Sequence, residues 1–156
     1  MEMTHFDKSG NAAMVDISDK PVTAREAVAQ GTIRMSEECL RMVKAGEHKK
    51  GDVLAVARVA GIMGAKRTSE LIPLCHNIGL TAVNIDFEYP ENENAIRVIC
   101  RVSCEGKTGA EMEALTGVNV ALLTVYDMCK AVDKRMVMEN VHLERKSGGK
   151  TGEFRF

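Results

Sequence analysis

The chain has 156 residues, of which 45% are hydrophobic and 28% are charged, and its formal net charge is −1. This length and composition predict one folded domain with a core of its own. The near-zero charge argues against a nucleic-acid partner, the apolar runs fall short of the roughly 20 residues of a membrane span, and five cysteines without a CxxC pair disfavour a zinc site or a disulfide framework.

The first 20 residues are polar and show no hydrophobic periodicity or secretory apolar segment. We expect a mobile N-terminal arm over residues 1–20, followed by a single catalytic α+β domain over residues 21–156 in a cytoplasmic protein. Residues 25–35 are ambiguous, because Thr23 and Glu26 imitate a helix capping box, whereas GTIRM is typical of a strand. We predict a strand.

Two helical segments follow. Ser36 is a predicted N-cap for a helix that ends at Gly46. After the loop EHKKGD, residues 52–70 predict a second helix, in which Val53, Val56, Ala60 and Met63 recur at helical spacing. The many alanines and glycines of this helix would let another backbone approach closely.

Alternating hydrophobic residues over 80–89 and 95–106 predict a hairpin with one buried face. A long helix is expected from Thr108 to about Lys134, then a strand over 136–146 and a tail. The order of elements is that of a split βαβ unit with one extra helix. It predicts an antiparallel sheet covered by helices on one face.

The start of the long helix, KTGAEMEALTGV, contains two glutamates. Thr108 and Glu111 have the spacing of a capping box, which favours a capping role for Glu111. The box does not explain Glu113, which is either a solvated helix residue or a ligand-binding one.

Near the end of the same helix, Asp127 and Lys130 interrupt the apolar run ALLTVYDMCKAV. They are either a surface ion pair or an acid and an amine in apolar surroundings, which suits proton transfer. Glu113 and Asp127 are 14 residues apart, about 21 Å along a helix. One small ligand cannot reach both in the same chain, so we expect an oligomer with an active site at a subunit interface.

Other polar segments leave alternatives open. His76 follows Cys75 in LIPLCHN and is either a buried, hydrogen-bonded histidine or a ligand-facing one, since adjacent residues rarely bind one metal. EGKTG and KSGGKTG lack the first glycine of a phosphate-binding P-loop, because Arg101 and Glu144 occupy its place. A P-loop kinase is therefore disfavoured, although these segments and the HKKG loop could still meet phosphate.

Four segments together, IPLCHN (72–77), GKTGAEMEALTGV (106–118), YDMCKAVDK (126–134) and KSGGKTG (146–152), closely resemble the MoaC family, the cyclic pyranopterin monophosphate synthases of molybdenum cofactor biosynthesis. The resemblance runs in the same order from about residue 4 to residue 154. It implies a ferredoxin-like fold, a hexamer built as a trimer of dimers, and a lyase that converts 3′,8-cyclo-7,8-dihydro-GTP to cyclic pyranopterin monophosphate and pyrophosphate. We expect no cofactor, no bound metal and no membrane or nucleic-acid partner.

The resemblance also implies roles for individual residues. By position in the motifs, the catalytic residues are Asp127, Lys130 and Lys50, and the substrate-binding residues are Leu74, Cys75, His76, Met112, Glu113, Glu111, Lys66, Lys146 and Arg25. We expect Glu113 to bind the N–H groups of the guanine-type ring, because an ionised carboxylate only accepts hydrogen bonds, and Glu111 to cap and support.

Small departures from the family pattern, at Ala110, Asn77 and Thr151, remove no ionisable group. The alternative is a non-catalytic nucleotide-binding regulatory module of the same fold. Such a module would not need an acid–amine pair within an apolar helix.

Overall fold

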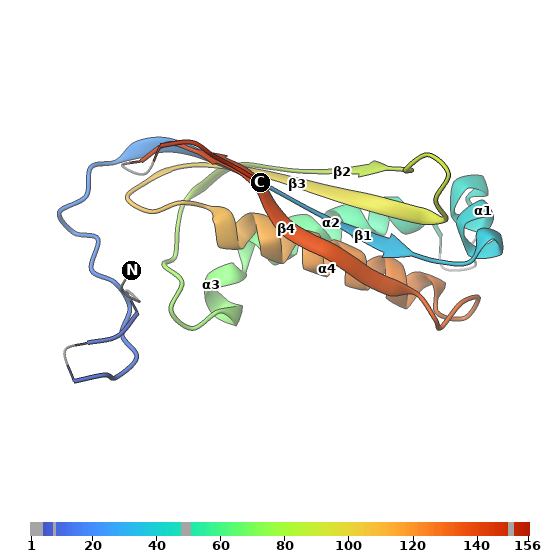
Figure 1. The fold of residues 1–156 in the computed structure, drawn as a ribbon, viewed down its shortest axis with the longest axis horizontal. Helices are drawn as coiled ribbons and strands as arrows, with labels where there is room; N and C mark the ends of the chain where they lie inside the picture. The colour runs from blue at the N-terminus through green and yellow to red at the C-terminus, as the bar shows by residue number, and fades with distance from the viewer. Residues whose placement is uncertain (1–4, 8, 48–50, 150–151) are drawn as a thin grey trace.

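The protein is an antiparallel sheet with helices packed on one face (Figure 1). The computed structural model describes residues 5–7, 9–47, 51–149 and 152–156. Its strands are β1 (Thr23–Arg34), β2 (Leu80–Glu88), β3 (Ala95–Gly106), β4 (Val137–Ser147) and β5 (Phe154–Arg155). They lie in the order β2-β3-β1-β4-β5, and every neighbouring pair is antiparallel.

The helices are α1 (Glu37–Ala45), α2 (Val53–Lys66), α3 (Thr68–Leu71) and α4 (Glu111–Cys129). The connection from β1 to β2 runs through α1, α2 and α3, and the connection from β3 to β4 runs through α4. In each case one strand lies between the two that are connected. This is the split βαβ arrangement of a ferredoxin-like fold, so the predicted fold class is confirmed.

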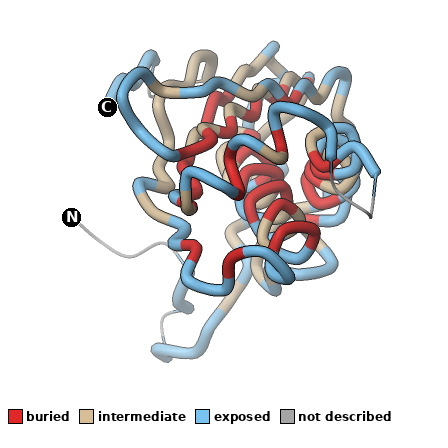
Figure 2. Tube along the Cα trace, turned by 90° about the vertical axis from the view of Figure 1, so that its right-hand side faces the viewer, coloured by how far each residue is buried: buried red, intermediate tan, exposed pale blue. Residues whose placement is uncertain are grey.

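The core lies between the sheet and the two long helices, α2 and α4 (Figure 2). The alternating residues of β3 that were predicted to be buried, Ile96, Val98, Cys100, Val102 and Cys104, are all at most 2% exposed. In β2 the pairing with β3 is irregular between Leu80 and Ala82. This irregularity puts Val83 rather than Ala82 on the core side, together with Ile85 and Phe87.

Helix α2 packs against α4 through small residues, as expected, but its buried face differs from the prediction. A side chain added at Gly64 would put its Cβ 2.7 Å from Val120 Cγ2 of α4. Val56 and Met63, predicted on the apolar face, are instead 43% and 47% exposed. The close approach of α4 selects the glycine and alanine side of α2, so Val56 and Met63 face outward, whereas Val53 is buried as predicted.

The ends of the helices were predicted with mixed success. Helix α1 has the predicted caps: Ser36 accepts a hydrogen bond from the backbone N–H of Cys39, and Gly46 has φ +68°. The predicted helix over 52–70 is divided into α2 and α3. The prediction of a capping box at Thr108 is wrong. Helix α4 begins at Glu111, and its N-cap, Ala110, makes no side-chain capping hydrogen bond.

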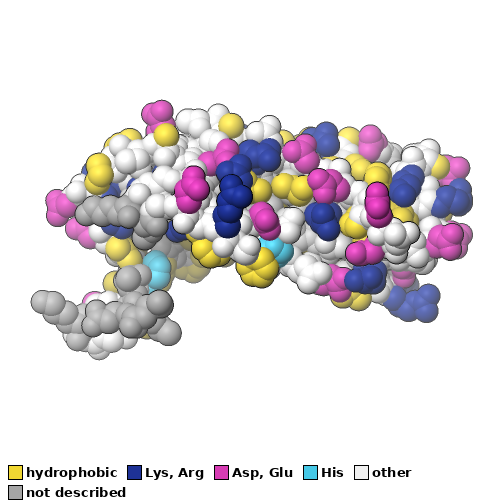
Figure 3. Space-filling view, turned by 45° about the horizontal axis from the view of Figure 1, so that its top comes forward, with side chains coloured by type: hydrophobic (Ala, Val, Ile, Leu, Met, Phe, Trp, Pro, Cys, Tyr) yellow, Lys and Arg dark blue, Asp and Glu magenta, His cyan; other side chains and the backbone are white. Residues whose placement is uncertain are grey.

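The face of the sheet turned away from the helices is polar. Arg145 and Glu26 form an ion pair of 2.6 Å across β4 and β1, and Arg97 and Glu88 form one of 3.2 Å across β3 and β2. Figure 3 shows side chains of both signs mixed over this side of the molecule. In the described part of the chain, no helix is long and apolar enough to cross a membrane.

Candidate active site

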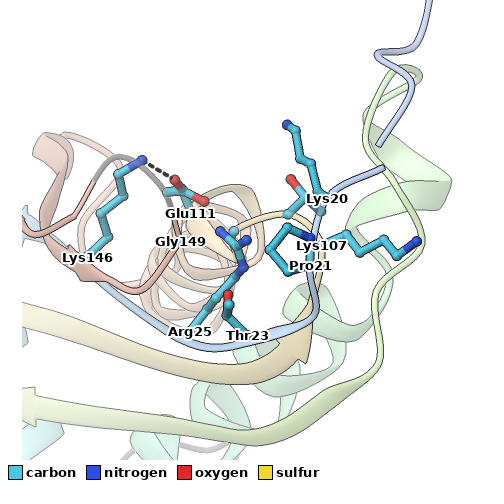
Figure 4. A pocket seen from close by; sticks show the side chains of 10 residues that line it. Lys20, Pro21, Thr23, Arg25, Lys107, Glu111, Lys146 and Gly149 are labelled. Atoms are coloured by element: carbon cyan, nitrogen blue, oxygen red, sulfur yellow. Dashed lines mark hydrogen bonds and ion pairs between the residues drawn. The ribbon is translucent and has the colours of Figure 1, made fainter. Parts of the chain in front are cut away.

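A cavity of about 500 Å³ opens where the beginning of β1, the end of β3, the beginning of α4 and the end of β4 meet (Figure 4). Among the described residues, its charged lining consists of four cations, Lys20, Arg25, Lys107 and Lys146, and one acid, Glu111. Such an excess of positive charge in one concave site attracts an anionic ligand. Three of these residues, Arg25, Glu111 and Lys146, were predicted from the sequence.

Strand pairing brings these residues together from distant parts of the chain. Arg25 lies opposite Cys104 of β3, and Lys146 lies opposite Ala27 of β1. The Arg25 Nε atom donates a hydrogen bond to the carbonyl oxygen of Gly106 at 3.0 Å. A Cβ at Gly148, where φ is +90°, would lie 2.3 Å from the backbone carbonyl oxygen of Ala24, so only glycine lets the turn after β4 pass this close to β1.

Glu111 does not cap its helix but forms an ion pair with Lys146. The distance from Lys146 Nζ to Glu111 Oε1 is 2.7 Å, and the side chains are 28% and 27% exposed. Figure 4 shows the two side chains pointing toward each other. The expected supporting role of Glu111 therefore takes the form of orienting a lysine, with its charge also placed favourably at the beginning of α4.

Of the lining residues that were not among the predicted site residues, Lys20, Lys107 and Thr23 carry polar side chains whose role the sequence did not indicate. Lys20 belongs to the segment expected to be a mobile arm and carried no signal beyond its charge. Lys107 lies in EGKTG, which was noted only as able to meet phosphate, and its Nζ donates to the carbonyl oxygen of Ser18 at 2.5 Å. Thr23 was considered as a helix cap, but it begins β1, and its buried Oγ1 has no hydrogen-bond partner among the described residues.

Glu113 is buried in the first turn of α4, two residues beyond Glu111, and is not among the described residues that line the cavity. It is only 5% exposed, so it is not the solvated residue of the alternative interpretation. Burial raises the pKa of Glu113, and the nearby charge of Glu111 raises it further. Burial is the main cause of the raised pKa values of Cys75 and Cys104, and the charge of Glu113 raises both further. Glu113 therefore lies near Cys75 of the LIPLCHN segment.

The predicted substrate-binding residues of the LIPLCHN segment, and Met112 of α4, are exposed to different degrees. Leu74, Cys75 and His76 are half-buried in the segment before β2, and Met112 is 38% exposed. The His76 Nε2 atom lies 2.7 Å from the carbonyl oxygen of Val15. Because a carbonyl only accepts, Nε2 carries the proton in this contact.

Lys66 lies away from the cationic cavity. It is exposed at the end of α2 and lines a separate hollow of about 310 Å³ that Ile62, Ile78 and Leu80 also line. Lys50, the third predicted catalytic residue, falls outside the described residues. Within the described ranges, no three His, Cys, Asp or Glu side chains gather as a metal ion would require.

Asp127 and Lys130 form an ion pair at the far end of α4. Lys130 Nζ is 2.6 Å from Asp127 Oδ1, and the side chains are 52% and 56% exposed. The expected apolar surroundings are therefore absent in the single chain. Met128 and Cys129 turn into the core, whereas Leu123, Asp127 and Lys130 share the outward side of the helix. The hydrogen bond with Asp127 and its negative charge raise the pKa of Lys130.

Six of the predicted site residues thus stand at opposite ends of one continuous helix. Arg25, Glu111, Glu113 and Lys146 gather at its beginning, and Asp127 and Lys130 stand at its end. From Glu113 to Asp127 the helix rises about 21 Å. The structure does not bring the two groups together within one chain.

Comparison with known proteins gives a consistent result. The sequence profile described as "MoaC family" matches residues 14–149. A cyclic pyranopterin monophosphate synthase of Clostridium perfringens is 56% identical over 155 residues, which are 99% of this chain and 98% of the relative. Proteins with the same name from Heliobacterium modesticaldum and Chloroflexus aurantiacus are 55% and 54% identical, over 97% and 98% of this chain and 96% and 94% of their own lengths.

Proposed function

The chain belongs to the MoaC family, and from this we propose that it is a lyase of molybdenum cofactor biosynthesis that converts 3′,8-cyclo-7,8-dihydro-GTP to cyclic pyranopterin monophosphate with release of pyrophosphate. The observation that carries the proposal is the 56% identity over 99% of the chain to a relative with that name. We also propose that the enzyme works in the cytoplasm as a hexamer built as a trimer of dimers.

The cationic cavity supports the proposal as a site for the triphosphate. Lys20, Arg25, Lys107 and Lys146 supply positive charge around about 500 Å³. Arginine and lysine are the side chains that bind phosphate oxygens through charge-assisted hydrogen bonds. Lys146 already pairs with Glu111 at 2.7 Å, so the acid holds the ammonium in place until a phosphate oxygen accepts from it.

Glu113 is the proposed partner of the ring system. A guanine-derived ring presents N–H donors, and a carboxylate can accept two of them side by side. Glu113 lies in the first turn of α4, only two residues beyond the cavity residue Glu111. The neighbouring motif residues Leu74, Cys75, His76 and Met112 then complete a half-buried wall for the rings.

The chemistry requires proton transfers for ring opening and reclosure. It also requires charge stabilisation while a ribose hydroxyl attacks the α-phosphate and pyrophosphate leaves. The raised pKa of Lys130 keeps its ammonium charged at neutral pH, which suits stabilisation of the charge on the leaving pyrophosphate, whereas proton donation would require a lower pKa in the assembled site. Asp127 orients Lys130 or takes up a proton, and Lys50 shares the proton-transfer role.

A shared site between two chains reconciles the two groups of residues. Because α4 separates Glu113 from Asp127 by about 21 Å, we propose that the beginning of α4 in one chain faces the end of α4 in another. The exposure of Asp127 and Lys130 leaves them accessible to such a partner chain.

The reaction itself is tested by incubating the purified chain with the cyclised GTP derivative. We expect stoichiometric release of pyrophosphate and of the cyclic monophosphate. If the derivative binds but is returned unchanged under reducing conditions, the chain is instead a binding module.

The shared site is tested by subunit mixing. Chains with Glu113→Ala and chains with Lys130→Ala should each be inactive. Dimers assembled from both would contain one intact site in every mixed pair, so random pairing should recover about a quarter of the wild-type rate. No recovery, despite mixed dimers detected by native mass spectrometry, would contradict a site between chains.

A further inference from the structure

The turn after α4 is attached to the rest of the protein by a buried carboxylate, that of Asp133. This residue is 7% exposed. Its Oδ2 atom accepts a hydrogen bond from the backbone N–H of Ser36 at 2.8 Å, and its Oδ1 atom accepts one from the backbone N–H of Arg135 at 2.8 Å. The two donors belong to the N-cap of α1 and to the connection that leads into β4.

The same turn contains Lys130. The backbone N–H of Lys130 donates a hydrogen bond to the carbonyl oxygen of Tyr126 at 2.9 Å. The backbone N–H groups of Val132 and Asp133 both donate to the carbonyl oxygen of Cys129, at 2.8 and 3.2 Å. The chain from Cys129 to Asp133 is therefore one closed turn, with the helix at one end and Asp133 at the other. The position of Lys130 therefore depends both on the end of α4 and on the contacts of Asp133.

Among the described residues, the side chain of Lys130 is held by its ion pair with Asp127, and it is about half exposed. An exposed ion pair stabilises by only about 0–1 kcal/mol and does not fix the geometry of two side chains. A reacting ammonium needs its backbone held in place instead, because a misplacement of about 1 Å can cost roughly 100-fold in rate.

We propose that Asp133 is a positioning residue for the reaction: by fastening the turn to the beginning of α1, it sets the place of Lys130 relative to Asp127. The reacting role of Lys130 rests on the proposed function, whereas the contacts of Asp133 are observed in the structure independently of it.

The chemistry of the contact explains why the residue is an aspartate. Two N–H donors from different elements reach two separate oxygens of one carboxylate. An asparagine would offer one oxygen and would set its own NH₂ group against the second donor. A glutamate would add a methylene group at a site that is 7% exposed. The fully buried Cys39 of α1 and Cys129 at the end of α4 also interact with each other.

The test compares Asp133→Asn with the wild-type chain. We expect kcat for pyrophosphate release to fall about 10- to 100-fold while KM changes little. The second readout is the acylation rate of Lys130 at mildly alkaline pH, measured by peptide mass spectrometry with Lys66 as internal reference. The charged and titratable groups that act on Lys130 are Asp127 and Tyr126 of α4. Weakening the Asp127 contact lowers the pKa of Lys130, so labelling should become faster.

A control separates positioning from a general loss of stability. Val53→Ala removes buried side-chain atoms from α2, where Val53 is 3% exposed, without touching the turn. It should lower Tm but leave both kcat and the labelling of Lys130 unchanged. If Val53→Ala reproduces both effects, or if Asp133→Asn shows neither, the proposal is overturned.

Two further outcomes are decisive as well. If Asp133→Asn does not fold, Asp133→Glu replaces it, because this variant keeps the charge and changes only the length of the side chain. A wild-type kcat together with a wild-type labelling rate of Lys130 in that variant would overturn the proposal. If the wild-type chain releases no pyrophosphate, the proposed function fails, but the labelling comparison still decides whether Asp133 positions Lys130.

Discussion

Replacing Glu113 by glutamine separates binding from stability, because the two effects should have opposite signs. Glutamine has nearly the shape of glutamate but no charge. Glu113 is 5% exposed, and burial raises its pKa above the ordinary 4.5. A carboxyl group of this kind destabilises the fold as the pH rises through and above its ordinary pKa, because ionisation is easier in the unfolded chain. At neutral pH the variant should be as stable as the wild type, or more stable. Well below pH 4.5 the difference should vanish.

Binding should weaken in the same variant. A hydrogen bond to a charged group contributes about 1.5–3 kcal/mol, so losing the ionised acceptor for the ring N–H groups should raise Kd about 10- to 150-fold. The measurement is calorimetric titration with the cyclised GTP derivative in a Lys130→Ala background, where the ligand is not consumed. Thermal unfolding is followed in parallel by circular dichroism.

The matched control is Glu37→Gln, which neutralises an exposed acid in the first turn of α1 and should leave Kd unchanged. The reasoning would be refuted by a Kd for Glu113→Gln within about twofold of the parent. It would equally be refuted by a fall in Tm that accounts for the weaker binding, since Glu113 would then be a structural residue.

Lys130→Ala should slow pyrophosphate release by at least about 100-fold, with a change in stability within about 0.5 kcal/mol because the side chain is exposed; a rate near that of the wild type would remove Lys130 from the mechanism. Gly64→Ala should lower the free energy of unfolding by about 1–3 kcal/mol in urea titrations, since its Cβ would lie 2.7 Å from Val120 Cγ2, and an unchanged midpoint would show that α2 and α4 can move apart freely. Lys107→Ala should raise KM for the triphosphate substrate at low ionic strength, and the difference should shrink as salt screens the remaining charges; a salt-independent difference would indicate a contact other than a phosphate. The hydrogen bonds from the backbone N–H groups of Arg135 and Ser36 lower the pKa of Asp133 below its ordinary 3.8. The stability from this group is complete above that value and is lost as the pH falls through the lower folded pKa, so urea unfolding between about pH 5 and pH 3 should be less acid-sensitive in Asp133→Asn than in the wild type.

Much of the architecture could be read from local pattern. The strict alternation of β3, from Ile96 to Cys104, has the period of a half-buried strand, and these side chains are at most 2% exposed. The caps of α1 at Ser36 and Gly46 are likewise local chemistry. The inward face of α2 could not be read in this way, because hydrophobicity favours Val56 and Met63. The close packing of α4 selects Gly61 and Gly64 instead.

The candidate site divides along the same line. The sequence by itself determined which groups are available and, through the length of one helix, that Glu113 and Asp127 cannot serve one ligand in one chain. Only the tertiary structure decided that Glu113 is buried while Lys130 is exposed, and that Lys20, Arg25, Lys107 and Lys146 line one cavity. Charge and local spacing are properties of the sequence itself, but burial and proximity arise from strand pairing and helix packing between residues far apart along the chain.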